Sequence, residues 1–208
     1  MHFNHFIQTL YQHLENLPGE KAHAQMTPYQ RPSALEIKNQ PINPKLSAVA
    51  LLLYPKKNDI HFVLTKRPEY EGTHSGQISF PGGKLEEKDA TLKHTALRET
   101  REEIGVQEEQ MNVLGELTQV YIPPSNFLVT PFLTYSDYTP EFSLNHEVIN
   151  IIEPNILDLL DDKNIISTKV NTKYGNFTVP AFNFNDHIVW GATAVMLSEF
   201  KEVVKRFY

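Results

Sequence analysis

The sequence predicts an α+β fold in which a mixed β-sheet is covered by helices. Three observations support this prediction. Runs with strand character precede and follow one long helix-forming segment, and a second helical segment closes the chain. A chain of 208 residues with 40% hydrophobic composition can also form one well-cored domain but is short for two. We place the domain at 47–208 and expect 1–46 to be an N-terminal helix and extended segment packed on it.

The elements can be assigned in order along the chain. Apolar residues at helical spacing predict an amphipathic helix at 2–17, and four prolines predict an extended crossing segment at 22–46. The segment after Trp190 predicts a C-terminal helix. Apolar runs predict strands at 47–54, 60–66, 77–80, 111–121, 127–135, 147–152, 165–170 and 177–184.

The most informative segment is a helix-forming run that carries three glutamates. Between Asp89, an N-cap residue type, and Gly105, a C′ residue type, there is neither proline nor glycine, which predicts one helix of about four turns. Glu99, Glu102 and Glu103 stand at i, i+3 and i+4, so their side chains project together. Like charges near the negative end of a helix dipole destabilise a bare helix. We therefore expect a cation to offset them.

Carboxylate oxygens suit hard divalent cations, with Mg²⁺ as the first choice and Mn²⁺ as the second. For the triplet alone, the alternative is a solvated acidic face with Arg98 and Arg101 as partners. The strand-like run and the glycine pair Gly82 and Gly83 before the helix favour the metal site. Paired glycines allow a backbone carbonyl or amide to approach a metal or a phosphate closely.

Two stretches of the sequence resemble a known family. The run RETREEIGV, from Arg98 to Val106, is similar to the second half of the Nudix hydrolase signature, REUxEExGU with U aliphatic, and departs from it at Thr100. The run from Leu64 to Gly83 resembles LTKRxxxxxxHxGQhSFPGG, with h hydrophobic, which precedes the signature in the coenzyme A pyrophosphatase branch. In the first half of the signature, Ala90 stands where a glutamate is usual, and Asp89 lies one residue earlier. An aspartate at this earlier position also resembles the coenzyme A pyrophosphatase branch.

The resemblance implies a Nudix-type α/β/α sandwich with a mixed β-sheet and a metal-dependent hydrolase. The implied reaction is hydrolysis of the diphosphate linkage of coenzyme A or acyl-CoA, which gives (acyl-)4′-phosphopantetheine and adenosine 3′,5′-bisphosphate. Two alternatives stay open. One is hydrolysis of another nucleoside diphosphate derivative, such as a dinucleotide, ADP-ribose or a nucleotide sugar. The other is a non-enzymatic Nudix-like module that binds a nucleotide, for which an eroded glutamate triplet would be the sign.

The acidic residues and one arginine have expected roles. Divalent cations held by Glu99, Glu103 and Glu102 would neutralise phosphate oxygens and lower the pKa of a bound water. Glu102 is expected to be the general base or a ligand. Glu147 resembles the outlying glutamate that many Nudix enzymes bring to the metals, and an exposed strand-end residue is the equal alternative. Arg98 is expected to orient a glutamate, because arginine forms forked pairs with carboxylates.

The net charge of −6 means that local cations must attract a polyanionic substrate. For Lys66 and Lys84 the alternative is a solvated side chain, and for His74 it is a loop histidine bonded to the backbone. Trp190 is expected to pack in the core, with adenine stacking as the alternative. The expected substrate-binding residues flank the glycine turn and are Lys66, Arg67, His74, Gln77, Gly82, Gly83 and Lys84.

Composition excludes several other classes. The chain has no cysteine, which excludes disulfides, thiolate metal sites and a cysteine nucleophile. No apolar run reaches about 18 residues and the N-terminus lacks a basic start, so we expect no membrane span, no secretion and a cytoplasmic location. Acidity without a basic stripe disfavours nucleic acid as a partner. The expected partner is a small-molecule substrate, and the N-terminal helix, which could pack on a second copy, leaves a homodimer open.

Overall fold

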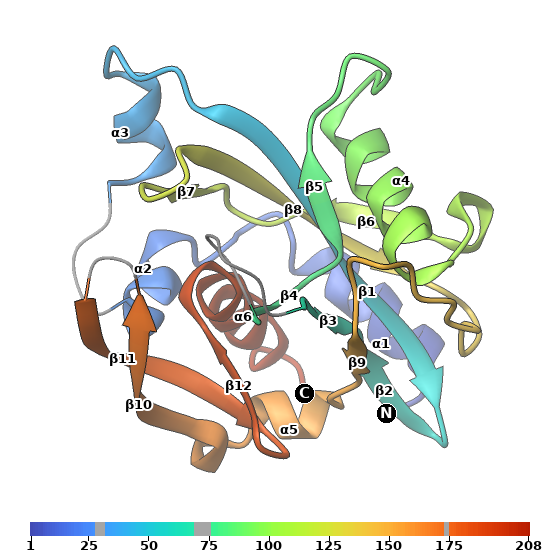
Figure 1. Cartoon of the computed structure of the whole chain (residues 1–208). Coiled ribbons are helices and arrows are strands. Elements are labelled where there is room, and N and C mark those ends of the chain that lie inside the picture. Colours follow the sequence, from blue (N-terminus) through green and yellow to red (C-terminus); the bar gives the residue numbers. More distant parts are fainter. Residues whose placement is uncertain (28–31, 69–75, 173–174) are drawn as a thin grey trace.

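The computed structural model describes residues 1–27, 32–68, 76–172 and 175–208. Within these ranges the strands form three β-sheets with helices packed on them, as Figure 1 shows. None of the helices in these ranges combines the length and the apolar character needed to cross a membrane.

The largest sheet has six strands and is mixed. Its central strands, β1 (Lys45–Lys56) and β8 (Phe127–Tyr135), run parallel to each other. Parallel neighbours need a long crossover connection, and the helix α4 (Leu92–Ile104) lies in the connection between these two strands. The other strands each pair antiparallel with β1 or β8 and are β2 (Asp59–Phe62), β5 (Gly82–Lys84), β6 (Asn112–Glu116) and β7 (Val120–Ile122).

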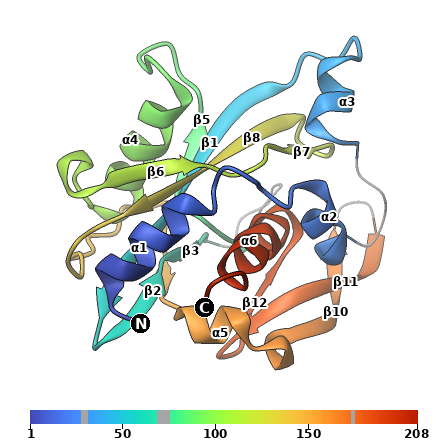
Figure 2. The same cartoon turned by 180° about the vertical axis from the view of Figure 1, so that it is seen from behind.

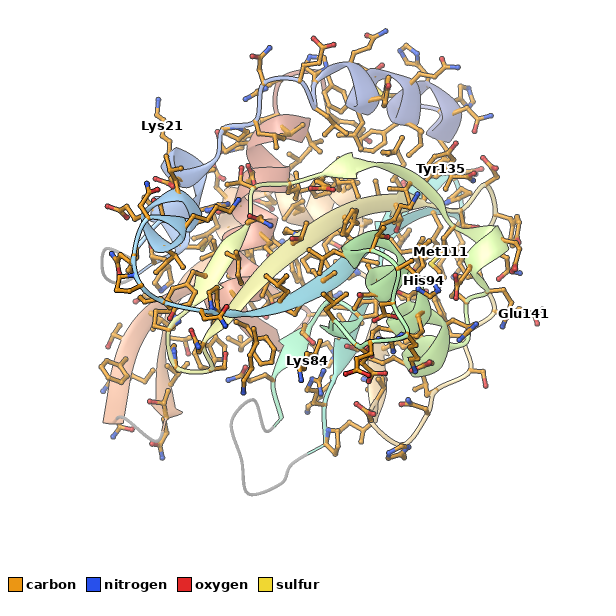
Figure 3. The ribbon with its side chains drawn as sticks, turned by 90° about the horizontal axis from the view of Figure 1, so that it is seen from above. Lys21, Lys84, His94, Met111, Tyr135 and Glu141 are labelled. Carbon is orange, nitrogen blue, oxygen red and sulfur yellow. The ribbon has the colours of Figure 1, made fainter. Side chains whose placement is uncertain are left out.

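The two faces of β1 belong to different parts of the core. Leu51 packs in the cluster that contains residues of α1 (Phe3–Gln12) and α6 (Gly191–Val204). Its neighbour Ala50 packs with Ala96 of α4. Because successive side chains of a strand point to opposite faces, α1 and α6 cover one face of the sheet and α4 covers the other. Figures 2 and 3 show this arrangement, which confirms the predicted α/β/α sandwich with a mixed sheet.

Two three-stranded sheets complete the structure. One of them positions the candidate site, because Lys66 is paired with Ile78 on one side and with Asn150 on the other. This sheet therefore joins the residues before the glycine turn to a segment far along the chain. In spatial order, the two sheets are β4 (Ile78–Ser79), β3 (Leu64–Lys66), β9 (Asn150–Ile152), and β10 (Ile165–Thr172), β11 (Gly175–Phe184), β12 (His187–Trp190).

The two terminal helices share the main core. Phe6 and Leu10 of α1 are fully buried, as are Phe200 and Val203 of α6, and all four lie in one cluster. The predicted helix after Trp190 is therefore present, as α6, and it packs in the core. The division of the chain after residue 46 stays a prediction.

The prediction that 22–46 is extended is wrong for much of that segment. The prediction gave weight to the prolines and overlooked a local signal for a helix at Ser33. Ser33 Oγ accepts a hydrogen bond from the Glu36 N–H at 3.0 Å, and the Glu36 carboxylate accepts one from the Ser33 N–H at 2.6 Å, which is a capping box. The helical elements in or next to this segment are α2 (Glu20–His23), the 3-10 turn η1 (Ala24–Met26) and α3 (Ala34–Lys38).

Some other boundaries also differ from the prediction. The first helix ends at Gln12 instead of residue 17. The predicted strand 60–66 divides in two because its halves have different partners, β1 for β2 and β9 for β3. The run 111–121 likewise divides into β6 and β7. The strand β5 lies where a glycine turn was expected, because Gly82 and Gly83 pair with β1. The other elements that were not predicted are β12, η2 (Glu108–Gln110), α5 (Ile156–Leu160) and η3 (Asp162–Asn164).

Candidate functional site

The acidic residues lie where β5, the second half of α4 and the segment before β9 meet (Figure 1). Backbone hydrogen bonds fasten that segment at both ends. The Asn145 N–H donates to the Glu103 carbonyl at 3.1 Å, and the Ile149 N–H donates to the Lys66 carbonyl at 2.9 Å. The segment 145–149 is therefore held between α4 and β3, and it brings Glu147 to the glutamate triplet.

The ends of α4 fix the position of the triplet. The helix begins after Thr91, whose hydroxyl accepts a hydrogen bond from the His94 N–H at 3.1 Å, so the prediction of Asp89 as the N-cap is wrong. It ends at Ile104 and is followed by the capping residue Gly105, which has the left-handed φ of 79°. A Cβ at Gly105 would lie 2.8 Å from Ser143 Cβ. Glycine is therefore favoured there by both backbone conformation and space.

Asp89 instead forms a forked ion pair with Arg98. Arg98 Nε donates to Asp89 Oδ1 at 2.7 Å, and Nη2 donates to Oδ2 at 2.8 Å. These hydrogen bonds hold the pKa of Asp89 well below its usual range, although burial opposes them. Arg98 Nη1 also lies 2.8 Å from Glu99 Oε1 and 3.0 Å from Glu102 Oε2. One buried guanidinium, 3% exposed, therefore links two members of the triplet to Asp89.

Glu103 is the most deeply buried member of the triplet, with 2% of its surface exposed. Its Oε2 accepts a hydrogen bond from the Gly82 N–H at 3.3 Å, and its Oε1 lies 3.4 Å from Arg67 Nη2. Burial raises the pKa of Glu103 to about 8, the charges of Glu99 and Glu147 add to this, and Arg67 and Gly82 oppose it. An uncompensated negative charge on Glu103 is thus costly.

The glycine pair gives the carboxylates room. A Cβ at Gly83 would lie 2.3 Å from Glu99 Oε1, and a Cβ at Gly82 would lie 2.4 Å from the carbonyl oxygen of Ala48. The absence of a Cβ therefore lets the Glu99 carboxylate approach Gly83 and the Ala48 backbone approach Gly82. The predicted approach of a backbone group to a metal or a phosphate stays a prediction. Burial raises the pKa of Glu99, Arg98 opposes this, and the nearby charges of Glu102 and Glu147 raise it further.

Glu102 and Glu147 form the open side of the cluster. Their side chains are 40% and 48% exposed, respectively. Glu102 Oε1 lies 3.6 Å from both Lys88 Nζ and Arg101 Nη2. Glu147 Oε2 lies 3.9 Å from Arg67 Nη1. The structure therefore brings Glu147 beside the triplet.

Within the described residues, no group of three His, Cys, Asp or Glu side chains already surrounds a common point as metal ligands do. The contacts explain this, because Arg98 holds oxygens of Glu99 and Glu102, and Arg67 holds an oxygen of Glu103. The donor set nevertheless fits a divalent cation. It offers carboxylate oxygens only, and two of the carboxylates have raised pKa values, so a cation would relieve the cost of their charge.

The predicted substrate-binding residues occupy different positions. Lys66 ends β3, and Lys84 ends β5 with an exposed side chain, labelled in Figure 3. The Gln77 carbonyl accepts a hydrogen bond from the Arg67 N–H at 3.0 Å. Arg67 itself lies between two carboxylates. His74 falls outside the described residues.

Two features of the site were missed by the sequence analysis. Lys88, in the loop before α4, lies 3.1 Å from Glu86 and 3.6 Å from Glu102, and a lysine in a polar loop carries no motif signal. The pairing of Asp89 with Arg98 had a signal, since the two residues are nine positions apart in one strand-loop-helix unit. Trp190 ends β12, where it is paired with Ala181, and its stacking alternative stays a prediction.

Comparisons with known proteins agree with this arrangement. The human mitochondrial coenzyme A diphosphatase NUDT8 is 38% identical over 130 residues, which are 60% of this chain and 54% of that protein. The uncharacterized Nudix hydrolase NudL of Photorhabdus laumondii is 30% identical over 146 residues, which are 69% of this chain and 76% of that protein. The match thus spans about half the length of NUDT8.

A solved structure and a family model give the same answer. The crystal structure of a MutT/nudix family protein from Enterococcus faecalis has a TM-score of 0.56 at 16% identity, covering 89% of this chain and 68% of that one, and so shares the fold. The model of the NUDIX domain matches residues 44–165, more than half of the chain. The chain therefore belongs to the Nudix family.

Proposed function

We propose that the chain is a metal-dependent Nudix hydrolase that cleaves the diphosphate linkage of coenzyme A or acyl-CoA. The observation that carries this proposal is the convergence of Glu99, Glu102, Glu103 and Glu147 beside the glycine pair of β5, Gly82 and Gly83. Four carboxylates in one place are costly unless cations neutralise them. Such a site is suited to the chemistry of a phosphate ester.

Hydrolysis of a diphosphate makes two demands on the site. The phosphate oxygens repel an attacking water, and the leaving phosphate carries additional negative charge. Mg²⁺ or Mn²⁺ held by Glu99, Glu103 and Glu102 would neutralise these oxygens and lower the pKa of a bound water. Arg98, buried and paired with Asp89, acts as a positioning residue that fixes the carboxylates of Glu99 and Glu102.

The general base must reach water. Glu102 and Glu147 are the exposed members of the cluster, whereas Glu103 is buried and held by Gly82 and Arg67. We therefore assign the base to Glu102 or Glu147. Glu102→Gln and Glu147→Gln should each lower kcat in saturating Mg²⁺, and near wild-type turnover of both variants would contradict the assignment. Glu109→Gln, an exposed glutamate outside the cluster, is the matched control.

The choice of coenzyme A rests on the segment from Leu64 to Gly83, which resembles that of the coenzyme A pyrophosphatase branch, and on the similarity to a protein named a coenzyme A diphosphatase. The products would be (acyl-)4′-phosphopantetheine and adenosine 3′,5′-bisphosphate. Lys66, Lys84 and His74 are the cations that we assign to substrate binding, because a chain of net charge −6 must attract a polyanion locally.

The test compares kcat/KM for coenzyme A, dephospho-coenzyme A, NADH and ADP-ribose in Mg²⁺. We expect coenzyme A to be preferred. Equal rates with substrates that lack the pantetheine arm would contradict the choice and indicate another nucleoside diphosphate derivative. Binding without turnover of any of the four would indicate a nucleotide-binding module. Hydrolysis in ¹⁸O-labelled water, followed by mass analysis of both products, identifies the phosphorus that is attacked.

A further inference from the structure

The cluster contains two arginines that are held in different ways. Arg98 is 3% exposed and makes short forked contacts of 2.7 and 2.8 Å with Asp89. Arg67 is 27% exposed, and its nitrogens lie 3.4 Å from Glu103 and 3.9 Å from Glu147. Charge-assisted N–H···O hydrogen bonds are normally about 2.7–2.9 Å long. Arg98 is therefore locked in place, whereas Arg67 is attracted by charge without tight hydrogen bonds.

Removal of each arginine would leave different carboxylates without a positive partner. Removing Arg98 from its place would leave Asp89, whose side chain is fully buried, without its ion pair, which is strongly destabilising. Removing Arg67 would leave the negative charges of Glu103 and Glu147 without the guanidinium between them. A divalent cation bound beside these carboxylates could supply the missing positive charge. Two positive charges offset two carboxylates better than one does.

The backbone of Arg67 can stay in place while its side chain turns. Its N–H donates to the Gln77 carbonyl at 3.0 Å, at the end of strand β3. Strand β3 is paired on both sides, with β4 and with β9. A change of partner by Arg67 therefore needs only rotation of its side-chain torsions, and no strand has to move.

We propose that Arg67 is an exchangeable counter-ion of the metal site. Its guanidinium bridges Glu103 and Glu147 until a divalent cation binds beside these two carboxylates, and it then turns to a phosphate of the substrate. The second half of this proposal rests on the proposed function, whereas the first half concerns the metal site alone. Before metal binding, Arg67 offsets part of the negative charge of the two carboxylates, and afterwards it supplies a cation for the diphosphate.

The first test measures Mn²⁺ binding to the full chain after chelator treatment, by electron paramagnetic resonance and with no nucleotide present. Arg67→Met should bind Mn²⁺ roughly tenfold more tightly than the wild type, because a competing positive charge is removed. The matched control is Lys205→Met. Lys205 Nζ also lies between two carboxylates, 3.5 Å from both Asp162 and Glu202, but away from the cluster. Its removal should leave the Mn²⁺ affinity unchanged.

Unchanged or weaker Mn²⁺ binding by Arg67→Met would overturn the proposal, as would an equal gain in the Lys205→Met control. If circular dichroism shows that Arg67→Met is unfolded, Arg67→Lys replaces it. Its ammonium is a compact charge that cannot span both carboxylates as the fork does, so its Mn²⁺ affinity should also exceed that of the wild type. Wild-type affinity in Arg67→Lys would then count against the exchange.

Chemical rescue separates a counter-ion from a structural residue. In Arg67→Ala, added guanidinium at a concentration well below denaturing levels should weaken Mn²⁺ binding more than NaCl of equal ionic strength does. The wild type should show no such difference. Equal effects of the two salts on Arg67→Ala would contradict the exchange.

The second half of the proposal is read from steady-state kinetics in saturating Mn²⁺. Arg67→Met should have a KM for coenzyme A raised roughly tenfold, in the direction opposite to its gain in metal affinity. Loss of both affinities would indicate a structural role instead. Absence of coenzyme A turnover in the wild type would contradict the proposed function, and the Mn²⁺ titration would still decide the first half.

Discussion

At the scale of single residues, the site depends on how a few carboxylates are neutralised. Asp89 has lost its freedom to titrate in the ordinary range because Arg98 binds it through two short hydrogen bonds. Glu103 shows the opposite effect, since burial raises its pKa to about 8. The same small region thus contains one carboxyl that strongly favours its charged form and one that resists it. The difference follows from the forked hydrogen bonds that Arg98 donates to Asp89 and from the burial of Glu103.

The Asp89–Arg98 pair should make stability depend on pH. The folded-state pKa of Asp89 is depressed, so its contribution is present above the unfolded-state pKa of about 3.9 and is lost as the pH falls toward the folded-state value. Asp89→Asn should lower the free energy of unfolding at pH 7 by roughly 3 kcal/mol. The difference from the wild type should shrink below about pH 4. Urea unfolding between pH 7 and pH 3 measures both, and a constant difference would refute the prediction.

Gly83→Ala should affect the carboxylate beside it more than the fold. The added Cβ would lie 2.3 Å from Glu99 Oε1, and the flexible end of a side chain can move away. We expect Mn²⁺ affinity to fall at least roughly tenfold while the melting temperature changes little. Unaltered Mn²⁺ affinity would show that Glu99 is not a ligand. The double variant Gly83→Ala/Glu99→Asp, with a shorter side chain, tests whether the effect arises from this contact.

At the scale of elements, the acidic cluster is assembled at the C-terminal end of α4. The helix delivers the triplet at its last turns, and the chain then returns so that Ser143 and Asn145 bond to the end of the same helix. The Ser143 N–H donates to the Ile104 carbonyl at 2.9 Å. The C-terminus of α4 is thus closed by the segment that carries Glu147. This coupling places an outlying glutamate beside a helix formed by local sequence.

Gly105→Ala should therefore disturb both stability and the site. Alanine at a φ of 79° is strained, and its Cβ would lie 2.8 Å from Ser143 Cβ. We expect a loss of about 1–2 kcal/mol in the free energy of unfolding. Because segment 143–147 must shift, kcat should also fall. Ala90→Gly, in the loop before the helix, serves as the control for an Ala/Gly change, and unchanged kcat in Gly105→Ala would contradict the coupling.

At the scale of the whole molecule, the N-terminal segment is joined to the C-terminal helix through a buried carboxylate. Glu199 of α6 is fully buried and accepts hydrogen bonds from the Gly19 N–H at 3.0 Å and the Thr118 hydroxyl at 2.6 Å. His23 Nε2 lies 3.1 Å from its other oxygen. Three segments far apart in the sequence thus meet at one side chain on the side of the sheet away from the acidic cluster.

Glu199→Gln should destabilise the molecule without changing the metal site. A glutamine has one acceptor oxygen and turns donor hydrogens toward groups that donate, which leaves buried polar groups unsatisfied. We expect the free energy of unfolding to fall by about 2–3 kcal/mol, with Mn²⁺ affinity unchanged. Glu202→Gln on the same helix, where the side chain is 31% exposed, should cost much less. Equal losses in the two variants would show that the buried contacts contribute little.

Much of the fold could be predicted because its signals are local. The apolar run of β1 and the run without proline or glycine that ends before Gly105 act within a few positions. They identify a strand and a helix of about four turns, although the helix begins after Thr91 and not after Asp89. The region 22–46 could not be predicted in the same way. Its prolines favour extended chain while the Ser33 capping box favours a helical turn, and the balance is set by packing of Ile37 against Tyr121 and Leu128.

The sequence by itself determined the helix that aligns Glu99, Glu102 and Glu103, since the spacing of side chains along an α-helix follows from its geometry. It also places the glycine pair directly before this helix, and the family resemblance predicts the α/β/α sandwich. Only the tertiary structure decided that Arg67 bridges Glu103 and Glu147, residues 36 and 80 positions further along the chain. Contacts over such separations depend on strand pairing and core packing, which local periodicity does not encode.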